Sequence, residues 1–499
     1  MKTNETSSEM AAIDLGSNSF HMIVARLQDN QLQILDRIKE PVRLASGLND
    51  DNRLDDKVAQ RALECLQRFG QRVRDIAPEN LRAVGTNTLR KAHSCGGFLD
   101  QAQTALNHSI EIISGIEEAR LIYLGAAHSL PDSGGQRLVV DIGGGSTELI
   151  IGEAFDPIEL ESLYVGCVGL SQRFFADGNI TKESMRSAML AARLELQPVK
   201  RLFRKLGWTL ATGSSGTIRA IRDVVTHAGW SDNGISAEAL KKLRTEMIRL
   251  GHTDALKLEG LSENRRPVFP GGVAILSAVF DALKLDRMLH STGAVREGVI
   301  YDLVGRLHHQ DIRETTVLAL AKRYQVDLQQ AQQVEKSALD LLDQVAKAWQ
   351  MDVDEARQWL HWASYLHEIG LVIAHSRYHK HGAYLIENSD LPGFSVRDQN
   401  FLATLILAHR RKLKPVTLEM LPASMRAVGL RLMIILRLSV ILNRGRSDET
   451  LPTIKISASD DKISLLFPEQ WLAINRLTDS SLETEIKILK NMGIKLRYS

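Results

Sequence analysis

The sequence predicts an α/β protein whose first two domains are built alike, followed by an all-α domain and a small α+β unit. A short phrase, DLGSNS at residues 14–19, recurs loosely as DIGGGS at residues 141–146, each time between two apolar runs. Apolar residues recur at helical spacing from about residue 311 to 446, and after residue 454 they alternate as in strands. A chain of 499 residues is long enough for several domains. We place them at residues 1–130, 131–309, 310–446 and 447–499.

Each copy of the repeated phrase is predicted to be the turn of a β-hairpin. Residues 10–13 and 20–24 form the strands around the first turn, and residues 138–140 and 149–151 those around the second. Glycine permits positive φ and brings backbone N–H groups close to an anion, and hydroxyl and amide side chains add donors. Two such loops predict two half-domains that face one phosphate-bearing ligand. The candidate phosphate-binding residues are Ser17, Asn18 and Ser19 in the first loop, and Gly143, Gly144, Gly145 and Ser146 in the second.

Two common phosphate-binding motifs are excluded. A dinucleotide fingerprint must lead into a helix, whereas residues 147–151 are predicted to be a strand. The P-loop pattern G-x-x-x-x-G-K-[ST] does not occur in the sequence. The alternative for either loop alone is a glycine-rich hairpin turn without a ligand. Because both loops begin with Asp and contain Ser, we favour phosphate binding.

The remaining elements of the first domain follow from local patterns. Apolar spacing predicts a helix over residues 58–76, and short apolar runs predict strands at residues 81–85 and 110–113. Residues 114–117 (SGIE) resemble a capping box that begins a second helix. The loop at residues 131–135 (PDSGG) is the predicted boundary to the second domain.

The second domain contains two further polar loops. The third loop contains Ser215, Gly216 and Thr217 between a strand and a helix, and the fourth, at residues 292–298, contains Arg296. Arg90 lies in a comparable loop of the first domain. An arginine in such a loop can bind phosphate with two hydrogen bonds, although solvated surface arginines are more frequent.

The composition is typical of a soluble globular protein. Hydrophobic residues are 44% and charged residues 24% of the chain, and the formal net charge is only +2, so affinity for a polyanion requires local clusters. The cysteines Cys65, Cys95 and Cys167 follow no metal-binding spacing and fit a reducing compartment. No secretory pattern opens the chain, and three arginines interrupt the apolar residues 425–442. We therefore expect a cytoplasmic protein without a membrane or nucleic-acid partner.

These loops predict phosphoryl transfer, which requires donors around the phosphate, a divalent metal and a group that orients the nucleophile. Asp14, Asp141 and Glu148 could hold Mg²⁺, or they could only cap turns. Glu117 and Glu118 stand in the first turn of a predicted helix. On spacing alone, interaction with the helix dipole explains both glutamates better than catalysis does.

The helical region contains a histidine-rich segment and two basic stretches. The phrase YLHEIG at residues 365–370 is similar to a His-Asp metal motif with Glu368 in the Asp position. This segment is either a working metal site or a structural remnant of such a motif. Because the sequence shows no dedicated spacing of metal ligands, we favour the remnant. The basic stretches, residues 377–381 and 409–414, are either exposed faces or the sides of a groove for a long anion.

The chain resembles the exopolyphosphatase and guanosine pentaphosphate phosphohydrolase family over nearly its whole length, up to about residue 446. The similarity is specific because several motifs match together. They are AIDLGSNSFH at residues 12–21, ISGIEEARL at 113–121, residues 140–149, SSGTI at 214–218, GAVREG at 293–298, HEIG at 367–370 and NSDLPGF at 388–394.

The resemblance implies two domains of the actin, sugar kinase and Hsp70 type with the active site in the cleft between them, then a His-Asp-like helical domain. It implies Mg²⁺-dependent hydrolysis of a terminal phosphoanhydride, with Glu118 as the base that activates water. It also places Asn18, Arg90, Glu148 and residues 143–146 near phosphate or metal. We further expect a homodimer.

The resemblance implies that the substrate is guanosine pentaphosphate, inorganic polyphosphate or both. Residues 37–49 look more like the guanosine enzyme, whereas Gly145, Ile218 and residues 379–394 look more like the exopolyphosphatase. We favour guanosine pentaphosphate slightly. A kinase of the same fold and a non-catalytic sensor of the alarmone or of polyphosphate remain as alternatives from other classes.

Overall fold

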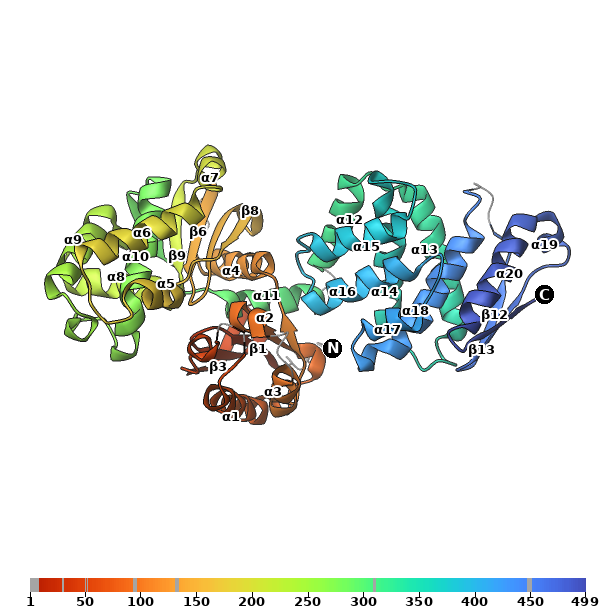
Figure 1. Ribbon diagram of the computed structural model, residues 1–499, viewed down its shortest axis with the longest axis horizontal. Coiled ribbons are helices and arrows are strands. Elements are labelled where there is room, and N and C mark those ends of the chain that lie inside the picture. The colour runs from red at the N-terminus through yellow and green to blue at the C-terminus, as the bar shows by residue number, and fades with distance from the viewer. Residues whose placement is uncertain are drawn as a thin grey trace, which may run out of the picture. The chain divides into compact units, whose positions relative to one another are not determined.

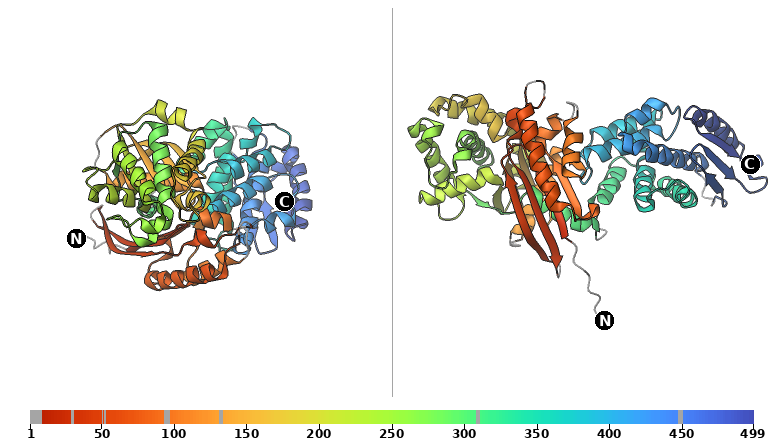
Figure 2. Two further views of the ribbon diagram at one scale, coloured as in Figure 1. Left: turned by 60° about the vertical axis from the view of Figure 1, so that its left-hand side comes forward. Right: turned by 90° about the horizontal axis from the view of Figure 1, so that it is seen from below.

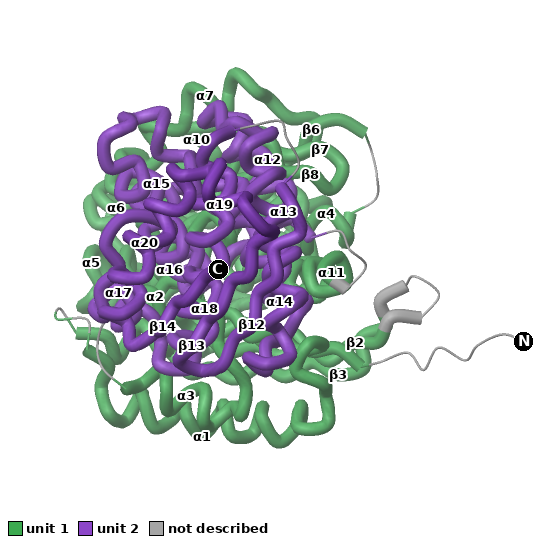
Figure 3. Tube along the Cα trace, turned by 90° about the vertical axis from the view of Figure 1, so that its right-hand side faces the viewer, with its two compact units in different colours: residues 1–310 green, residues 311–499 purple. Residues whose placement is uncertain are grey.

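The computed structural model describes residues 9–28, 31–49, 51, 53–92, 97–130, 134–307, 311–446 and 451–499. The chain forms two compact units, residues 1–310 and residues 311–499 (Figure 3). Within unit 1 there are two sheets, and within unit 2 a helical bundle continues into a small three-stranded sheet (Figure 1). The finer boundaries at residues 130 and 446 stay predictions, and residues 131–133 of the predicted boundary loop lie outside the described residues.

The first half of unit 1 is a five-stranded sheet in the order β3-β2-β1-β4-β5, with β1 to β3 antiparallel (Figure 2). β4 and β5 continue the sheet in parallel to β1. The elements are β1 (Glu9–Leu15), β2 (Phe20–Gln28), β3 (Gln31–Glu40), η1 (Leu44–Gly47), α1 (Asp56–Val73), η2 (Pro78–Asn80), β4 (Leu81–Gly85), α2 (Asn87–Ala92), α3 (Phe98–Leu106), β5 (Ile110–Ile112) and α4 (Gly115–Ser129).

The second half repeats this topology. β6, β7 and β8 are antiparallel, β9 and β11 continue in parallel to β6, and β10 adds an antiparallel edge. The elements are β6 (Gln136–Ile142), β7 (Thr147–Glu153), β8 (Asp156–Leu163), α5 (Cys167–Phe174), α6 (Lys182–Leu196), α7 (Lys200–Leu206), β9 (Leu210–Ser214), α8 (Ser215–His227), β10 (Ile235–Ser236), α9 (Ala237–Leu250), η3 (Thr253–Ala255), η4 (Glu263–Val268), α10 (Phe269–Leu283), β11 (Arg287–His290) and α11 (Val295–Leu307).

Two helices join the halves of unit 1. α4 packs on β6, β7 and β8, α11 packs on β1, β2 and β4, and the two helices pack on each other. One apolar core therefore runs from Ile23 of the first sheet through Ile122 and Ile300 of the helices to Ile150 of the second sheet. Burial of this continuous apolar surface fixes the two hairpin turns relative to each other.

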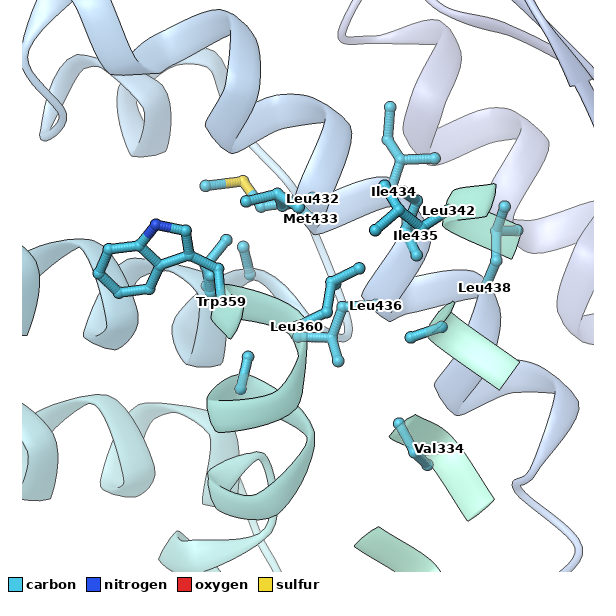
Figure 4. Packing of buried hydrophobic residues seen from close by; sticks show 14 of the residues in the cluster. Val334, Leu342, Trp359, Leu360, Leu432, Met433, Ile434, Ile435, Leu436 and Leu438 are labelled. Carbon is cyan, nitrogen blue, oxygen red and sulfur yellow. The ribbon is translucent and has the colours of Figure 1, made fainter. Parts of the chain in front are cut away.

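Unit 2 has one continuous core. Val334, Leu342, Trp359 and Leu436 belong to a cluster that extends into the C-terminal strands (Figure 4). The elements are α12 (Ile312–Arg323), α13 (Leu328–Val345), α14 (Val353–Leu366), η5 (Ile369–Val372), α15 (Tyr378–Asn388), α16 (Val396–Ala408), α17 (Pro415–Glu419), α18 (Ala423–Leu442), β12 (Lys455–Ala458), β13 (Lys462–Leu466), α19 (Trp471–Ile474), α20 (Arg476–Lys490) and β14 (Lys495–Tyr498).

Two strongly apolar segments are core helices. The segment predicted at residues 425–442 lies in α18, where Arg437 is buried and donates to both carboxylate oxygens of Glu485 at 2.6 and 2.7 Å. Among the described residues, one segment, Glu263–Leu283, is long and apolar enough by composition to span a membrane, but 78% of its apolar 18-residue stretch is buried inside the protein. Such burial is typical of a core helix.

Candidate active site

Most of the predicted site residues line one cavity of about 460 Å³ in unit 1, which we call the main cavity, whereas Arg90, Gly145 and Glu148 do not line it. The loops after β1, β6, β9 and β11 contribute to its lining, as expected where parallel strands end. The predicted residues that line it are Asp14, Ser17, Asn18, Ser19, Glu118, Asp141, Gly143, Gly144, Ser146, Ser215, Gly216, Thr217 and Arg296.

The two hairpin turns face each other directly. A Cβ on Gly144 would lie only 3.1 Å from Cβ of Ser17, so this approach favours glycine. Ser17 is held by Thr88, whose hydroxyl donates to Oγ of Ser17 at 2.8 Å. The second turn is closed by the N–H of Gly143, which donates to the carbonyl of Ser146 at 3.0 Å. The structure thus brings both loops of the repeated phrase to one space.

Three predicted residues lie differently from expectation. Gly145 does not line the main cavity, because its backbone packs against Asn87. Arg90 lies in helix α2 instead of a loop, and its Nη1 donates to Glu118 Oε2 at 3.2 Å and to the carbonyl of Ile113 at 2.6 Å. Arg296 lies in the first turn of α11 instead of a loop. Local polarity suggested loops at both arginines, but their helices pack on the sheets, and this packing outweighs local preference.

The acidic wall of the main cavity is formed by Asp14, Glu118 and Asp141, with the buried Glu148 behind them. Burial and then the charge of Glu118 raise the pKa of Asp14 to about 7. Burial also raises the pKa of Asp141 to about 7, with a further contribution from Glu118. Burial, Glu118 and Asp141 raise the pKa of Glu148 well above its usual value. These groups therefore repel one another without enough protein cations to balance them.

Glu118 is positioned by the start of helix α4. Ser114 caps this helix by accepting from the N–H of Glu117 at 3.1 Å, which is half of the predicted capping box. The Glu117 carboxylate points instead to Arg120, which donates to its Oε2 at 2.7 Å. Burial raises the pKa of the Glu118 carboxyl, while Arg90 opposes the shift. The two adjacent glutamates therefore face different surroundings.

The acidic wall fits a divalent cation. Oδ1 of Asp14 is buried and accepts no hydrogen bond within the described part of the chain. Carboxylate oxygens are the ligands that Mg²⁺ prefers, and Mg²⁺ usually keeps several waters and binds substrate phosphates as well. In the described ranges no three His, Cys, Asp or Glu side chains converge closely enough to hold an ion by themselves. The protein could thus supply only part of a coordination sphere.

The main cavity also has a basic wall, which the sequence did not reveal. It consists of Lys39, Arg219, Arg222 and Arg265. Partial burial and the charges of Arg265 and Arg219 lower the pKa of Lys39 to about 8. Arg222 is paired with Asp223 at 2.6 Å, but no carboxylate of the described residues lies within ion-pair distance of the other three cations. Arg219 and Arg222 follow the predicted third loop by about one helical turn. From this spacing the sequence could have predicted that both arginines lie on the same side of the helix as the loop.

The N-terminus of α8 also lines the main cavity. Ser215, Gly216 and Thr217 form its first turn, where backbone N–H groups lack partners within the helix and attract anions. Ser215 has φ of 82°, a conformation that is strained for a residue with a side chain. A Cβ on Gly216 would lie 1.8 Å from Nη2 of Arg265, so a side chain at this position would displace the guanidinium from where it now lies.

Two histidines of the main cavity are held neutral, and sequence reasoning gave neither a role. Nη1 of Arg296 lies 3.1 Å from Nδ1 of His21, which must accept because arginine has no lone pair to offer. Burial and Arg296 lower the pKa of His21 to about 3. Burial and Arg222 lower the pKa of His290 to about 4. Both rings can therefore add hydrogen bonds without adding charge.

The His-Asp-like segment of unit 2 is arranged differently from a metal site. Nη2 of Arg446 donates to both oxygens of Glu368 at 2.7 and 2.6 Å. The carboxylate at the position of the expected metal ligand is therefore already bound to an arginine. His367 and His409 are buried and neutral, and each Nδ1 lies within 2.7 Å of a backbone carbonyl. The two basic stretches lie side by side, because the guanidinium of Arg410 lies 4.2 Å from the ring centre of Tyr378.

Comparison with known proteins assigns the chain to a family. Residues 23–307 match the model of the Ppx/GppA phosphatase family, and residues 312–486 match that of Ppx/GppA phosphatase domain III. A guanosine-5'-triphosphate,3'-diphosphate pyrophosphatase of Aeromonas hydrophila is 40% identical over 97% of both chains. One of Vibrio vulnificus is 42% identical over 97% of this chain and 96% of the relative. The chain belongs to the Ppx/GppA phosphatase family.

A solved structure supports the fold of this Ppx/GppA family member. An exopolyphosphatase from Cytophaga hutchinsonii matches with a TM-score of 0.55 and 22% identity, over 60% of this chain and 98% of that one. The predicted fold class is thereby confirmed: two actin-like domains with a cavity between them, followed by a helical domain III with a small α+β unit.

Proposed function

We propose that this protein hydrolyses the terminal phosphoanhydride of guanosine pentaphosphate, giving guanosine tetraphosphate and phosphate. The names of the relatives from Aeromonas hydrophila and Vibrio vulnificus support the reaction. The observation that carries the proposal is that one cavity is lined both by a group of carboxylates, the acidic wall, and by a group of cations, the basic wall. A nucleotide with a 5'-triphosphate and a 3'-diphosphate presents two anionic groups. The basic wall can bind one of them directly, and the acidic wall can bind the other through a divalent cation.

Glu118 is the proposed base. It takes a proton from a water molecule whose oxygen bonds to the terminal phosphorus, while the bond from phosphorus to the bridging oxygen breaks and that oxygen keeps the electron pair. The base must stay close to the water and have a pKa near the working pH. Burial moves the pKa of Glu118 in that direction, and the hydrogen bond from Arg90 fixes the carboxylate.

Asp14, Asp141 and Glu148 are proposed to hold Mg²⁺, directly or through water. When bound, Mg²⁺ supplies positive charge that offsets the repulsion between the acidic wall and the substrate phosphates. The backbone N–H groups of the two hairpin turns and of the first turn of α8 then orient the terminal phosphate. We propose that Ser17, Asn18, Ser146 and Thr217 add side-chain donors, because all four line the main cavity.

Inorganic polyphosphate is the second candidate substrate. Its support is the pair of basic stretches at residues 377–381 and 409–414, which lie side by side at the surface of unit 2. A chain of phosphates gains affinity from such clusters by counterion release. A homodimer and a cytoplasmic location are further proposals that rest on the sequence.

The deciding experiment compares kcat/KM for guanosine pentaphosphate with that for polyphosphate on the same preparation. We expect the guanosine substrate to be preferred, and free phosphate to appear without an added acceptor. A need for an acceptor would indicate a kinase, and binding without turnover in Mg²⁺ would indicate a sensor.

The basic wall is tested by the double change Arg219→Ala and Arg265→Ala. Loss of charge-assisted hydrogen bonds should raise KM for guanosine pentaphosphate about tenfold or more, with a smaller effect on kcat. The matched control is Arg186→Ala with Arg201→Ala, two exposed arginines outside the main cavity. An equal KM in both double variants would remove the basic wall from substrate binding.

A further inference from the structure

A second, smaller cavity opens beside the main cavity. It has a volume of about 270 Å³ and shares Ser17, Asn18 and Val268 with its neighbour. We call it the side pocket. It is lined from the first half of unit 1 by the turn after β1 and by Arg43, Ala45 and Ser46. From the second half it is lined by α5 with the two residues that follow this helix, and by η4.

The lining of the side pocket is suited to a flat ring with polar edges. Val168, Phe175 and Pro267 give it apolar surface. Asn18, Gln172 and Asn264 give it amide groups, each with both a donor and an acceptor. Gln172 is exposed, and its side chain makes no hydrogen bond within the described part of the chain. Apolar surface with a few amides does not replace the solvation of a phosphate group, but it is the usual lining for an uncharged heterocycle.

The segment η4 connects the two cavities in a way that matches the geometry of a nucleotide. Arg265 lines the main cavity, Asn264 and Pro267 line the side pocket, and Val268 lines both. On a nucleoside, the 3'-oxygen and the base are attached to the same ribose. A 3'-phosphate at Arg265 therefore leaves the base within reach of the side pocket, while the 5'-phosphates lead to the hairpin turns.

Arg43 links the two halves of unit 1 at this pocket. Its Nη2 donates to Oδ1 of Asn264 at 3.1 Å, and its backbone N–H donates to the carbonyl of Asn18 at 2.8 Å. Its φ of 53° is uncommon for a residue with a side chain. A planar guanidinium held in this position can stack on a base as well as bond to Asn264.

We propose that the side pocket binds the purine base of the nucleotide substrate and so separates nucleotides from linear phosphate chains. This inference rests on the proposed function of the main cavity. It assigns the specificity for the base to Val168, Gln172, Phe175 and Asn264, none of which is near the acidic wall in sequence.

The test is Ala176→Phe, which fills the side pocket from an exposed position after α5. KM is measured for guanosine pentaphosphate and for tripolyphosphate, which has three phosphates and no base. We expect the ratio of the two KM values to rise about tenfold or more, a usual range for steric exclusion from a hydrophobic pocket. Arg173→Phe is the matched control, because Arg173 is exposed on α5 and lines neither cavity, and its ratio should equal that of the wild type.

A second readout does not depend on turnover. The 8-azido derivative of guanosine pentaphosphate, activated by light, should label residues 168–176 or 264–268. An unchanged KM ratio in Ala176→Phe, or labelling elsewhere, overturns the inference while the proposed function stands. If the wild type releases phosphate from tripolyphosphate but not from guanosine pentaphosphate, the proposed function itself fails.

Discussion

Two groups of buried charge lie beside the first turn of α4, and they differ in how they are balanced. On one side, Glu117 and Asp302 are surrounded by Arg82 and Arg120: Arg82 Nη1 donates to Asp302 Oδ2 at 2.7 Å, and Arg120 donates to both carboxylates. On the other side, Asp14, Glu118 and Asp141 of the acidic wall line the main cavity, and the buried Glu148 interacts electrostatically with Glu118 and Asp141. Glu117 and Glu118 are neighbours in sequence and belong to different groups.

The same burial has opposite electrostatic consequences in the two groups. Burial by itself raises the pKa of Asp302, but Arg120 and Arg82 hold that pKa well below its usual range. In the acidic wall burial and mutual repulsion both raise the pKa values. Balanced charges within the fold hold helices together, whereas charges that the protein leaves unbalanced are available for a ligand.

Removal of divalent cations should give the largest effect. If the acidic wall works only with a cation, excess chelator should abolish phosphate release, and added Mg²⁺ should restore it. Activity assays in a chelator titration check this. The double variant His367→Ala, Glu368→Ala should show the same Mg²⁺ requirement as the wild type, because both carboxylate oxygens of Glu368 already accept hydrogen bonds from Arg446. Full activity in excess chelator contradicts the proposed role of the acidic wall.

Glu118→Gln should have the next largest effect. The amide cannot accept the proton of water, so we expect kcat to fall roughly 10²–10⁴-fold, as for loss of a general base, with substrate affinity retained. Single-turnover assays together with equilibrium binding separate the two quantities. A kcat close to that of the wild type would exclude Glu118 as the base.

Glu117→Gln should affect stability instead of chemistry. The sequence predicts only a mild effect on kcat, but the structure adds that this carboxylate is fully buried between arginines. Breaking a buried ion pair costs about 3–5 kcal/mol, because charged partners stay behind. In denaturant unfolding, Glu117→Gln should therefore be less stable than Glu118→Gln, whereas its kcat should be higher. If both variants lose stability equally, the contrast between the two groups fails.

The basic stretches of unit 2 are groups of cations that could bind a long anion. Neutralising Arg410, Arg411, Lys412 and Lys414 should flatten the salt dependence of long-chain polyphosphate binding by up to about 3 in the log–log slope, by analogy with single-stranded nucleic acids. Short substrates should be unaffected. The measurement is the affinity ratio of long to short substrate across a salt series. The control neutralises the exposed residues Lys462, Lys487, Lys490 and Lys495, and equal slopes in the two variants would contradict a groove.

The smallest expected effect is on the free energy of unfolding and concerns His361, a histidine that lies between two carboxylates. Its Nδ1 lies 2.6 Å from Glu335 and its Nε2 2.9 Å from Glu314. Burial opposes its charge, but these two carboxylates raise its pKa to about 9. Because the folded pKa exceeds the unfolded one, the pair stabilises fully below about pH 6.5 and loses its contribution as the pH rises through 9. The difference in unfolding free energy between wild type and His361→Gln should shrink by roughly 1–3 kcal/mol from pH 6 to pH 10, and a constant difference would contradict this assignment.

Local patterns in the sequence determined the elements that carry the main cavity. The strand at Leu81–Gly85, the paired hairpins around residues 14–19 and 141–146, and the strand that leads to Ser215 are found where they were predicted. Each of these elements is determined by residues that are only a few positions apart in the sequence. The signals are the alternation of apolar residues, a glycine in a turn or a side chain that caps a helix. The same patterns predicted that the two turns face one ligand.

Only the tertiary structure decided which charges are balanced. Asp302 pairs with Arg120 across 182 positions, and Lys39 approaches Arg219 and Arg265 from the other half of unit 1. The placement of Arg90 and Arg296 in helices, and of Gly145 against Asn87, likewise depends on packing between distant segments. A local window shows that Glu117 and Glu118 stand in the first turn of a helix, but not that Glu117 lies among arginines while Glu118 lines the main cavity. These surroundings are set by burial of the apolar core that joins the two halves, and this is a property of the whole fold.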